Sequence, residues 1–281
     1  MPETPIDYIP RMLELHAEAP PYRWAEPGAL PPPAGPAAPL AATRIVVVSL
    51  AGLRLRTQAP YELRGDTSIR LVPVDAAPAE LAFDHFGFKV ERAAADPETT
   101  APLAALRALA ADGTIGGVAP LAIGAMGATY SQRRVGEELV PTVTAAALDS
   151  AADLALIVPA CPLDHQTAAL VARGIEAAGM RALVISGARD ISLRVGAPRT
   201  VYVHAPLGWL LGVPGDAAGQ RERLAAALAA GIGLPGMGEL VDLDPAYPSG
   251  AAGTPHSSRF PELTDWEARE YRPGYDTGIT R

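Results

Sequence analysis

Residues 153–186, DLALIVPACPLDHQTAALVARGIEAAGMRALVIS, decide the fold of this chain. The stretch 153–160 is a nearly continuous apolar run, typical of a strand buried on both faces of a parallel sheet. Apolar residues then recur at helical spacing over 162–179, and a second apolar run follows at 181–186. A strand, a helix and a strand with short links predict a βαβ unit, whose two strands are parallel.

Strands and helices continue to alternate outward from this unit. Further strands are expected at IVVVSL (45–50), at IRLVPV (69–74), where Pro73 favours a sheet edge, and at TVYVH (200–204). Helices are expected over 102–111, ending near Gly113, from about Val135, where Pro141 kinks or splits the helix, and from an Asp216 cap to about Ala230. We interpret GTIGGVAP (113–120) and GAMGATYS (124–131) as Gly-rich loops, and the residues after Ser186 as a short charged turn.

The pattern predicts one doubly wound α/β domain over 44–231, with a mostly parallel sheet and helices on both faces. Residues 1–43 are expected to form an N-terminal arm, with a short helix at 6–18 and a Pro/Ala/Gly-rich run at 26–39. Residues 232–281 are rich in Gly, Pro and aromatic side chains. They are expected either to pack as an extended C-terminal arm, on the domain or on a neighbouring subunit, or to form a loosely ordered tail.

Composition excludes several classes of function. The 281 residues carry a net charge of −8, which argues against a nucleic-acid-binding surface. No stretch has the roughly 18 apolar residues of a membrane span, and the acidic N-terminus lacks the apolar core of a secretion signal, so we expect a cytoplasmic protein. Lys89 follows Phe88, which excludes a Walker A loop. With Cys161 as its one cysteine, the chain has no intrachain disulfide, CxxC pair or Cys-rich metal site.

Cys161 is the strongest candidate for a reactive group. It follows the expected central strand and precedes Pro162, which suits a first helical turn. Free backbone N–H groups and the helix dipole favour an anion there, and such a thiol can have a pKa of roughly 3.5–7.5. His165, four residues on, would share its helix face, and would pair with the thiolate or give a proton to a leaving group. The structural alternative is a small buried Cys161 beside an ordinary histidine.

Ligands in open α/β sheets bind beyond the carboxyl ends of the strands. Polar side chains at or near these ends are therefore candidates for substrate binding, namely His85, Ser131, Gln166, Ser186, Arg189 and His204. Structural roles fit them as well. Arg189 with Asp190 fits a surface ion pair, His204 fits the end of a strand, and His85 fits a loop position.

Four segments carry a resemblance to a known family. They are IDYIPRMLELHAEAPPYRWA (6–25), DGTIGGVAP (112–120), CPLDHQTAALVARGIEAAGM (161–180) and HAPLGWLLGVPGDAAGQ (204–220). Together they resemble the selenoprotein B subunits of glycine, sarcosine and betaine reductases and the selenoprotein of D-proline reductase. The resemblance covers roughly residues 5 to 232, and the segment around Cys161 is its most specific part.

The resemblance implies a chemistry and a set of partners. In that family a selenolate attacks the carbon α to a substrate amine and cleaves the C–N bond, while a pyruvoyl group on a separate subunit holds the substrate. Cys161 aligns with the selenocysteine and His165 with the histidine after it. Here sulfur replaces selenium, which makes a poorer nucleophile. The chain shows no pyruvoyl-forming segment, so it is expected to bind no cofactor, and a pyruvoyl group would belong to a partner subunit.

Three functions follow as hypotheses. The first is a thiol-dependent reductase that acts on a small amine- or amino-acid-like substrate. Because the chain has no second cysteine, an external thiol or a thioredoxin-like protein would reduce it again. The second is an Asp/Glu-type racemase or isomerase, in a one-base or Cys/His form. The third is a non-catalytic subunit of a reductase complex, for which the two arms would supply contacts. A homo-oligomer is expected, without nucleic acid, metal or membrane.

Overall fold

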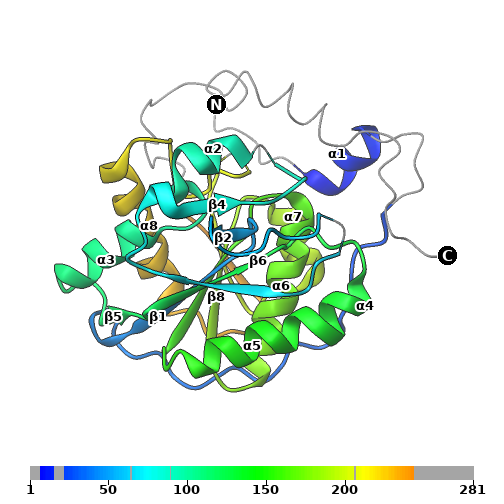
Figure 1. Cartoon of the computed structure of the whole chain (residues 1–281). Coiled ribbons are helices and arrows are strands. Elements are labelled where there is room, and N and C mark those ends of the chain that lie inside the picture. The colour runs from blue at the N-terminus through cyan, green and yellow to red at the C-terminus, as the bar shows by residue number, and fades with distance from the viewer. Residues whose placement is uncertain (1–6, 16–21, 64, 89, 206, 244–281) are drawn as a thin grey trace, which may run out of the picture.

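The computed structural model describes residues 7–15, 22–63, 65–88, 90–205 and 207–243 (Figure 1). Its strands are β1 (Arg44–Ser49), β2 (Leu53–Leu55), β3 (Ile69–Pro73), β4 (Leu81–Phe83), β5 (Gly117–Val118), β6 (Leu121–Ala125), β7 (Leu154–Val158), β8 (Arg181–Ser186), β9 (Arg199–Tyr202) and β10 (Glu239–Asp242). Its α-helices are α1 (Tyr8–Leu15), α2 (Val90–Ala95), α3 (Leu103–Ala111), α4 (Gln132–Arg134), α5 (Val140–Asp149), α6 (Pro162–Ala177), α7 (Arg189–Val195) and α8 (Ala217–Ile232).

The central sheet confirms the predicted fold class. Its strands lie in the order β10-β9-β8-β7-β1-β6-β3, and β5 pairs with the start of β1. All of these strand pairs are parallel except that between β3 and β6, so β3 is the antiparallel edge strand that Pro73 favoured. A second, two-stranded sheet pairs β2 with β4 in antiparallel fashion.

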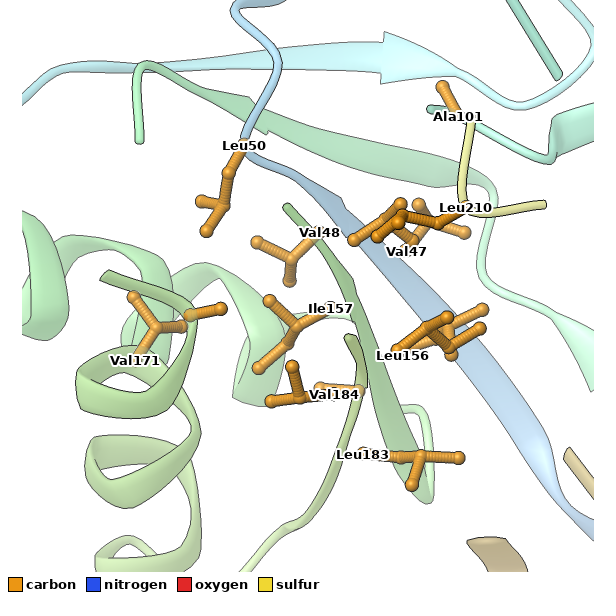
Figure 2. Packing of buried hydrophobic residues seen from close by; sticks show 14 of the residues in the cluster. Val47, Val48, Leu50, Ala101, Leu156, Ile157, Val171, Leu183, Val184 and Leu210 are labelled. Atoms are coloured by element: carbon orange, nitrogen blue, oxygen red, sulfur yellow. The ribbon is translucent and has the colours of Figure 1, made fainter. Parts of the chain in front are cut away.

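Buried side chains alternate between the two faces of the sheet. Val47, Leu156 and Leu183 lie beside one another on β1, β7 and β8, and Val48, Ile157 and Val184 form the next row. Figure 2 shows the second row pointing toward Val171 of α6 and the first row pointing to the opposite side. All of these side chains are buried, and each stabilises the fold by roughly 1.5–3 kcal/mol.

Helices cover both faces, as expected. On the face of Val48 and Ile157, α6 packs between α5 and α7. On the other face α8 contacts the sheet and α3, and a Cβ atom at Gly231 of α8 would lie 2.5 Å from the Leu183 side chain. Because every central strand is covered twice, the strand sequences are apolar runs rather than alternating patterns.

The strand order places a switch point between β1 and β7. After β1 the chain moves to β6 on one side, whereas after β7 it moves to β8 on the other side. Connections that leave neighbouring strands in opposite directions open a crevice at the carboxyl end of the sheet, where ligands bind in doubly wound folds. Cys161 follows β7 at this point.

The two predicted Gly-rich loops are in part strands, which corrects the sequence interpretation. Residues 117–118 form β5, and residues 121–125 form β6, a central strand beside β1. Gly124 hid this strand because glycine is normally depleted in strands. The structure needs it, since a Cβ atom at Gly124 would lie 1.9 Å from the carbonyl oxygen of Leu53 in β2.

Two more segments differ from expectation. The short charged turn after Ser186 contains a helix, α7, which ends at Gly196 in the left-handed conformation with φ +75°. Residues 239–242, inside the expected C-terminal arm, form β10 and extend the sheet past β9. The rest of that arm, residues 244–281, lies outside the described residues.

The helix around Pro141 is divided, one of the two outcomes predicted for this proline. Residues Val135–Leu139 form a π-helical stretch between α4 and α5, and Pro141 lies in the first turn of α5. Because proline lacks an N–H group and crowds the preceding turn, the regular hydrogen-bond pattern changes here.

The described part of the N-terminal arm packs on α6. Residues 22–39 contain no helix or strand, and they are held by side chains of the domain. The N–H of Ala25 donates to Gln166 at 2.8 Å, and the N–H of Ala34 donates to Glu176 at 2.7 Å. Helix α1 packs on α7, where the N–H of Ile9 donates to Asp190 at 2.7 Å.

The close approach at Gly124 gives a test of the fold. We expect Gly124→Ala to lower the free energy of unfolding by about 2–3 kcal/mol, because the added methyl group meets backbone that has no rotamer to change. The exposed Gly136, with open space around its Cβ position, supplies the control, and Gly136→Ala should be neutral or stabilising by up to about 1 kcal/mol. Urea denaturation of both variants measures the difference, and equal stabilities would contradict the packing.

Candidate functional site

Cys161 is the N-cap of α6, as predicted from the sequence. Its backbone is extended, with φ −132° and ψ 172°, and Pro162 begins the helix. The carboxylate of Asp164, in the first turn, accepts hydrogen bonds from the N–H groups of Ala160 at 2.8 Å and Cys161 at 2.9 Å. This carboxylate therefore fixes the turn between β7 and α6 that carries the thiol.

His85 reaches the same carboxylate from another part of the chain. It follows β4, and its Nε2 lies 3.0 Å from Oδ1 of Asp164, with both side chains fully buried. The N–H of Gly87 donates to Nδ1 of the same ring at 2.8 Å. Because Nδ1 accepts a hydrogen bond, the proton of the neutral ring is on Nε2, which donates to Asp164.

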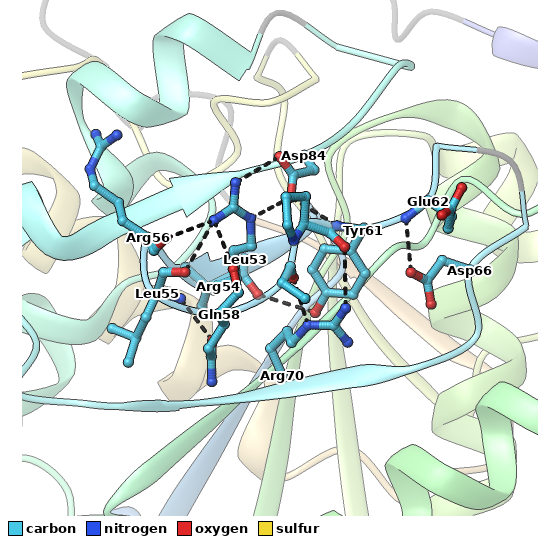
Figure 3. Close-up of polar contacts among 12 residues, drawn as sticks. Leu53, Arg54, Leu55, Arg56, Gln58, Tyr61, Glu62, Asp66, Arg70 and Asp84 are labelled. Atoms are coloured by element: carbon cyan, nitrogen blue, oxygen red, sulfur yellow. Dashed lines mark hydrogen bonds and ion pairs between the residues drawn. The ribbon is translucent and has the colours of Figure 1, made fainter.

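An ion pair holds the chain just before His85. Arg54 on β2 makes a two-pronged contact with Asp84, with 3.2 Å between Nη2 and Oδ1, and the N–H of Tyr61 donates to the same carboxylate at 3.0 Å (Figure 3). Both charged side chains are largely buried. The small β2–β4 sheet thus places His85 above the carboxyl end of the central sheet.

The thiol, the imidazole and the carboxylate form one cluster. Ligand atoms of Cys161, His85 and Asp164 all lie within 4.8 Å of one another. This spacing suits a metal ion, but N–H groups already occupy both oxygens of Asp164 and Nδ1 of His85, so a cation would have to displace hydrogen bonds. The hydrogen bonding fits a thiol beside a carboxylate-oriented imidazole better than it fits a set of metal ligands.

Aromatic and apolar side chains surround the thiol. Cys161 is 1% exposed and packs in a cluster with the buried Tyr61, Met126, Ala128 and Leu163. The half-buried rings of Tyr22, Phe86 and Tyr130 lie against this cluster, with Phe86 stacked on Tyr130 at 5.8 Å. A substrate can therefore reach the sulfur only after part of this cover has moved.

His165 lies on the same turn but contacts backbone rather than the sulfur. Its Nε2 accepts from the N–H of Gly187 at 3.0 Å, so its Nδ1 carries the proton and donates to the carbonyl of Cys161 at 2.7 Å. Burial lowers the pKa of His165 to about 4, against a smaller opposing effect of the Cys161 carbonyl. The ring is neutral and joins the strand ends of β7 and β8. Its predicted role as a proton donor is untested.

Two other predicted residues hold neighbouring segments. Gln166 is buried, accepts from the N–H of Ala25 and donates to the hydroxyl of Tyr22 at 2.8 Å, which places that ring at the edge of the thiol cluster. Ser131 is the N-cap of α4 and accepts from the N–H of Arg134 at 3.4 Å.

The remaining predicted residues follow β8 and β9. Ser186 is buried and shares a hydrogen bond of 2.8 Å with Ser192. Arg189 pairs with Asp242 at 3.4 Å near the surface, rather than with Asp190. His204 is half-buried beside Tyr202, with 6.2 Å between the ring centres. None of these contacts joins them to Cys161, and their role in substrate binding stays a prediction.

Asp164 is the residue that sequence reasoning missed. A capping residue followed three positions later by an acidic side chain is a known signal of a helix start, and Cys161 with Asp164 has that spacing. The signal was obscured because cysteine is not an expected cap.

His165 makes the stability of the fold depend on pH. Its folded-state pKa of about 4 lies below the unfolded value of roughly 6.5, so the unfolded chain binds the extra proton between these values. The contribution is present above pH 6.5 and is lost as the pH falls toward 4. Between pH 7 and 4.5 we expect the wild type to lose about 2 kcal/mol more than His165→Asn, which cannot take up this proton. Urea denaturation at both pH values measures the loss, and equal losses would contradict it.

No helix among the described residues has the length and apolar character needed to cross a membrane.

Comparison with known proteins relates this chain to a reductase subunit. No protein-family model matches the chain, and no solved structure matches it. The chain is 27% identical over 203 residues to D-proline reductase subunit gamma of Acetoanaerobium sticklandii, an alignment that covers 72% of this chain and 84% of that protein. This likeness supports a relationship to reductase subunits.

Proposed function

We propose that this chain is a subunit of a thiol-dependent reductase, with Cys161 as the nucleophile. The observation that carries the proposal is the position of Cys161, which caps α6 at the switch point of the sheet beside an imidazole held by a carboxylate. The relative named a D-proline reductase subunit supports the same class of reaction.

The proposed reaction reduces a C–N bond at a carbon next to a carbonyl group. The thiolate of Cys161 attacks this carbon, so an S–C bond forms and the C–N bond breaks, and the nitrogen leaves with the electron pair and takes a proton. An external dithiol then attacks the sulfur. An S–S bond forms, the S–C bond breaks, and the carbon takes a proton. The second thiol of the dithiol restores Cys161, so the substrate gains two electrons and the dithiol becomes a disulfide.

The surroundings of Cys161 favour a small substrate delivered from one side. The half-buried rings of Tyr22, Phe86 and Tyr130 are the partly exposed side chains packed against its cluster, whose other members are buried, and we propose that the substrate reaches the sulfur past these rings. Because the relative is a subunit, we propose that other subunits complete the site and present the substrate there. A pyruvoyl group on such a subunit is part of this proposal, as is a small amine- or amino-acid-like substrate.

The test uses the full chain purified with its co-purifying subunits, D-proline as the first probe and dithiothreitol as the reductant. Cleavage of the ring C–N bond would give a linear amino acid two mass units heavier, which mass spectrometry detects. We expect Cys161→Ser to lower the rate at least 10³-fold, because an alcohol is a far weaker nucleophile, and Gly136→Ala to leave the rate unchanged.

Two outcomes would contradict the reductase. Cleavage that persists in Cys161→Ser would leave the thiol without a role in the reaction. Solvent deuterium that enters the substrate at Cα, with no cleavage in the wild type, would instead favour a racemase or isomerase.

A further inference from the structure

We infer that His85 is the base that ionises Cys161, that Asp164 stabilises the resulting charge, and that the backbone N–H of Gly87 controls when this happens. The inference rests on the proposed function in one respect, since it takes Cys161 as the nucleophile. It assigns the acid–base partner of that thiol to a histidine 76 residues away in the sequence, rather than to His165 on the same helix turn.

Geometry separates the two histidines. Both ring nitrogens of His165 are bound to backbone groups of Cys161 and Gly187, within the turns that follow β7 and β8. His85 has its Nε2 on Asp164, and among the described residues its Nδ1 accepts from the N–H of Gly87 at 2.8 Å, a contact within its own loop. Of the two histidines, His85 is the one in the cluster with Cys161 and Asp164. In that cluster a ring nitrogen, the sulfur and a carboxylate oxygen lie within 4.8 Å of one another.

Asp164 prepares His85 for a positive charge. Its carboxylate faces Nε2–H, so a second proton on Nδ1 would give an imidazolium paired with a buried anion. In this step the S–H proton of Cys161 moves to Nδ1 of His85. The products are a thiolate, an imidazolium and a carboxylate in sequence. Without this transfer, a negative thiolate would lie near the negative Asp164 carboxylate while the ring stayed neutral. The repulsion between the two negative charges would disfavour ionisation of the thiol.

Gly87 covers both reacting atoms. A Cβ atom at Gly87 would lie 2.8 Å from the sulfur of Cys161 and 3.1 Å from Cε1 of His85, so only glycine fits this closely. The same residue donates its N–H to Nδ1. When the backbone of Gly87 moves away, it therefore frees the lone pair of Nδ1 of His85, which accepts the proton. The same movement uncovers the sulfur of Cys161. The thiol stays protonated while it is covered and ionises when substrate can reach it.

The other groups around His85 do not compete for the proton, because they are aromatic or already paired. Phe86 stacks on the ring at 5.8 Å between centres, and Phe88 lies at 4.8 Å. Asp84, the preceding residue, is paired with Arg54. Among the described residues, Cys161 and Asp164 share the polar cluster with His85. Tyr61, which packs beside the thiol, donates its hydroxyl to the carbonyl of Leu53 at 3.2 Å.

The test is the pH dependence of alkylation of the full chain by iodoacetamide, followed by mass spectrometry. Cys161 is the one cysteine in the sequence, so each added carbamidomethyl group reports on it. An ordinary thiol with a pKa near 8.5 reacts about 300-fold more slowly at pH 6 than at pH 9.5. We expect the wild type to slow by less than about 30-fold, because His85 takes the proton at pH 6.

His85→Gln is the matched variant, since its amide can still donate to Asp164 but cannot accept the thiol proton. We expect its rate to fall by at least 300-fold between pH 9.5 and pH 6, with a rate at pH 9.5 close to that of the wild type. Movement of the groups that cover the thiol changes the alkylation rates at both pH values by the same factor. If His85 had a purely structural role, the ratio of the two rates would be the same in the variant and the wild type, and that result would overturn the inference.

The wild-type profile keeps the inference falsifiable even if the variant does not fold. A wild-type ratio near 300-fold overturns the inference whatever the C–N cleavage assay shows. A ratio below 30-fold in the wild type and near 300-fold in His85→Gln, together with no cleavage of substrate, supports the base and contradicts only the proposed reductase. The two proposals can therefore fail separately.

Discussion

The carboxylate of Asp164 is the group on which the site depends. It is fully buried, yet it accepts hydrogen bonds from two backbone N–H groups of the turn that carries Cys161 and one from the ring of His85. A buried anion is costly unless it is paired or hydrogen-bonded, and here the first turn of α6 and the imidazole supply these partners. One side chain thus joins the helix start, the thiol and a loop from the other half of the domain.

That arrangement requires a second layer over the carboxyl end of the sheet. The β2–β4 sheet supplies it, because the ion pair of Arg54 with Asp84 fixes the chain immediately before His85 (Figure 3). The layer can lie so close to the central strands only because Gly124 has no side chain below Leu53. The close packing at Gly124 in β6 and the polar cluster of His85 and Asp164 above it are therefore structurally linked.

The sequence was informative where burial and local backbone chemistry favour the same structure. The apolar runs of β1, β7 and β8, the cap at Asp216 and the edge position of β3 were all predictable, because burial and local backbone chemistry agree there. Prediction failed at β6, where close packing requires glycine in a strand, and at α7, which is short and carries charged residues. The pairing of His85 with Asp164 spans 79 positions, and no local pattern encodes a contact at that separation.

The N-terminal arm has a consequence for the order of folding. Residues 22–39 have no regular structure of their own, and side chains far along the chain hold their backbone, among them Gln132, Gln166, Arg173, Glu176 and Arg181. During synthesis residues 22–39 leave the ribosome before α6 and β8, yet their docking surface does not exist until α6 and β8 have been made and have packed. The arm must therefore dock after these later segments have folded, and contacts of such long sequence separation slow the approach to the native state.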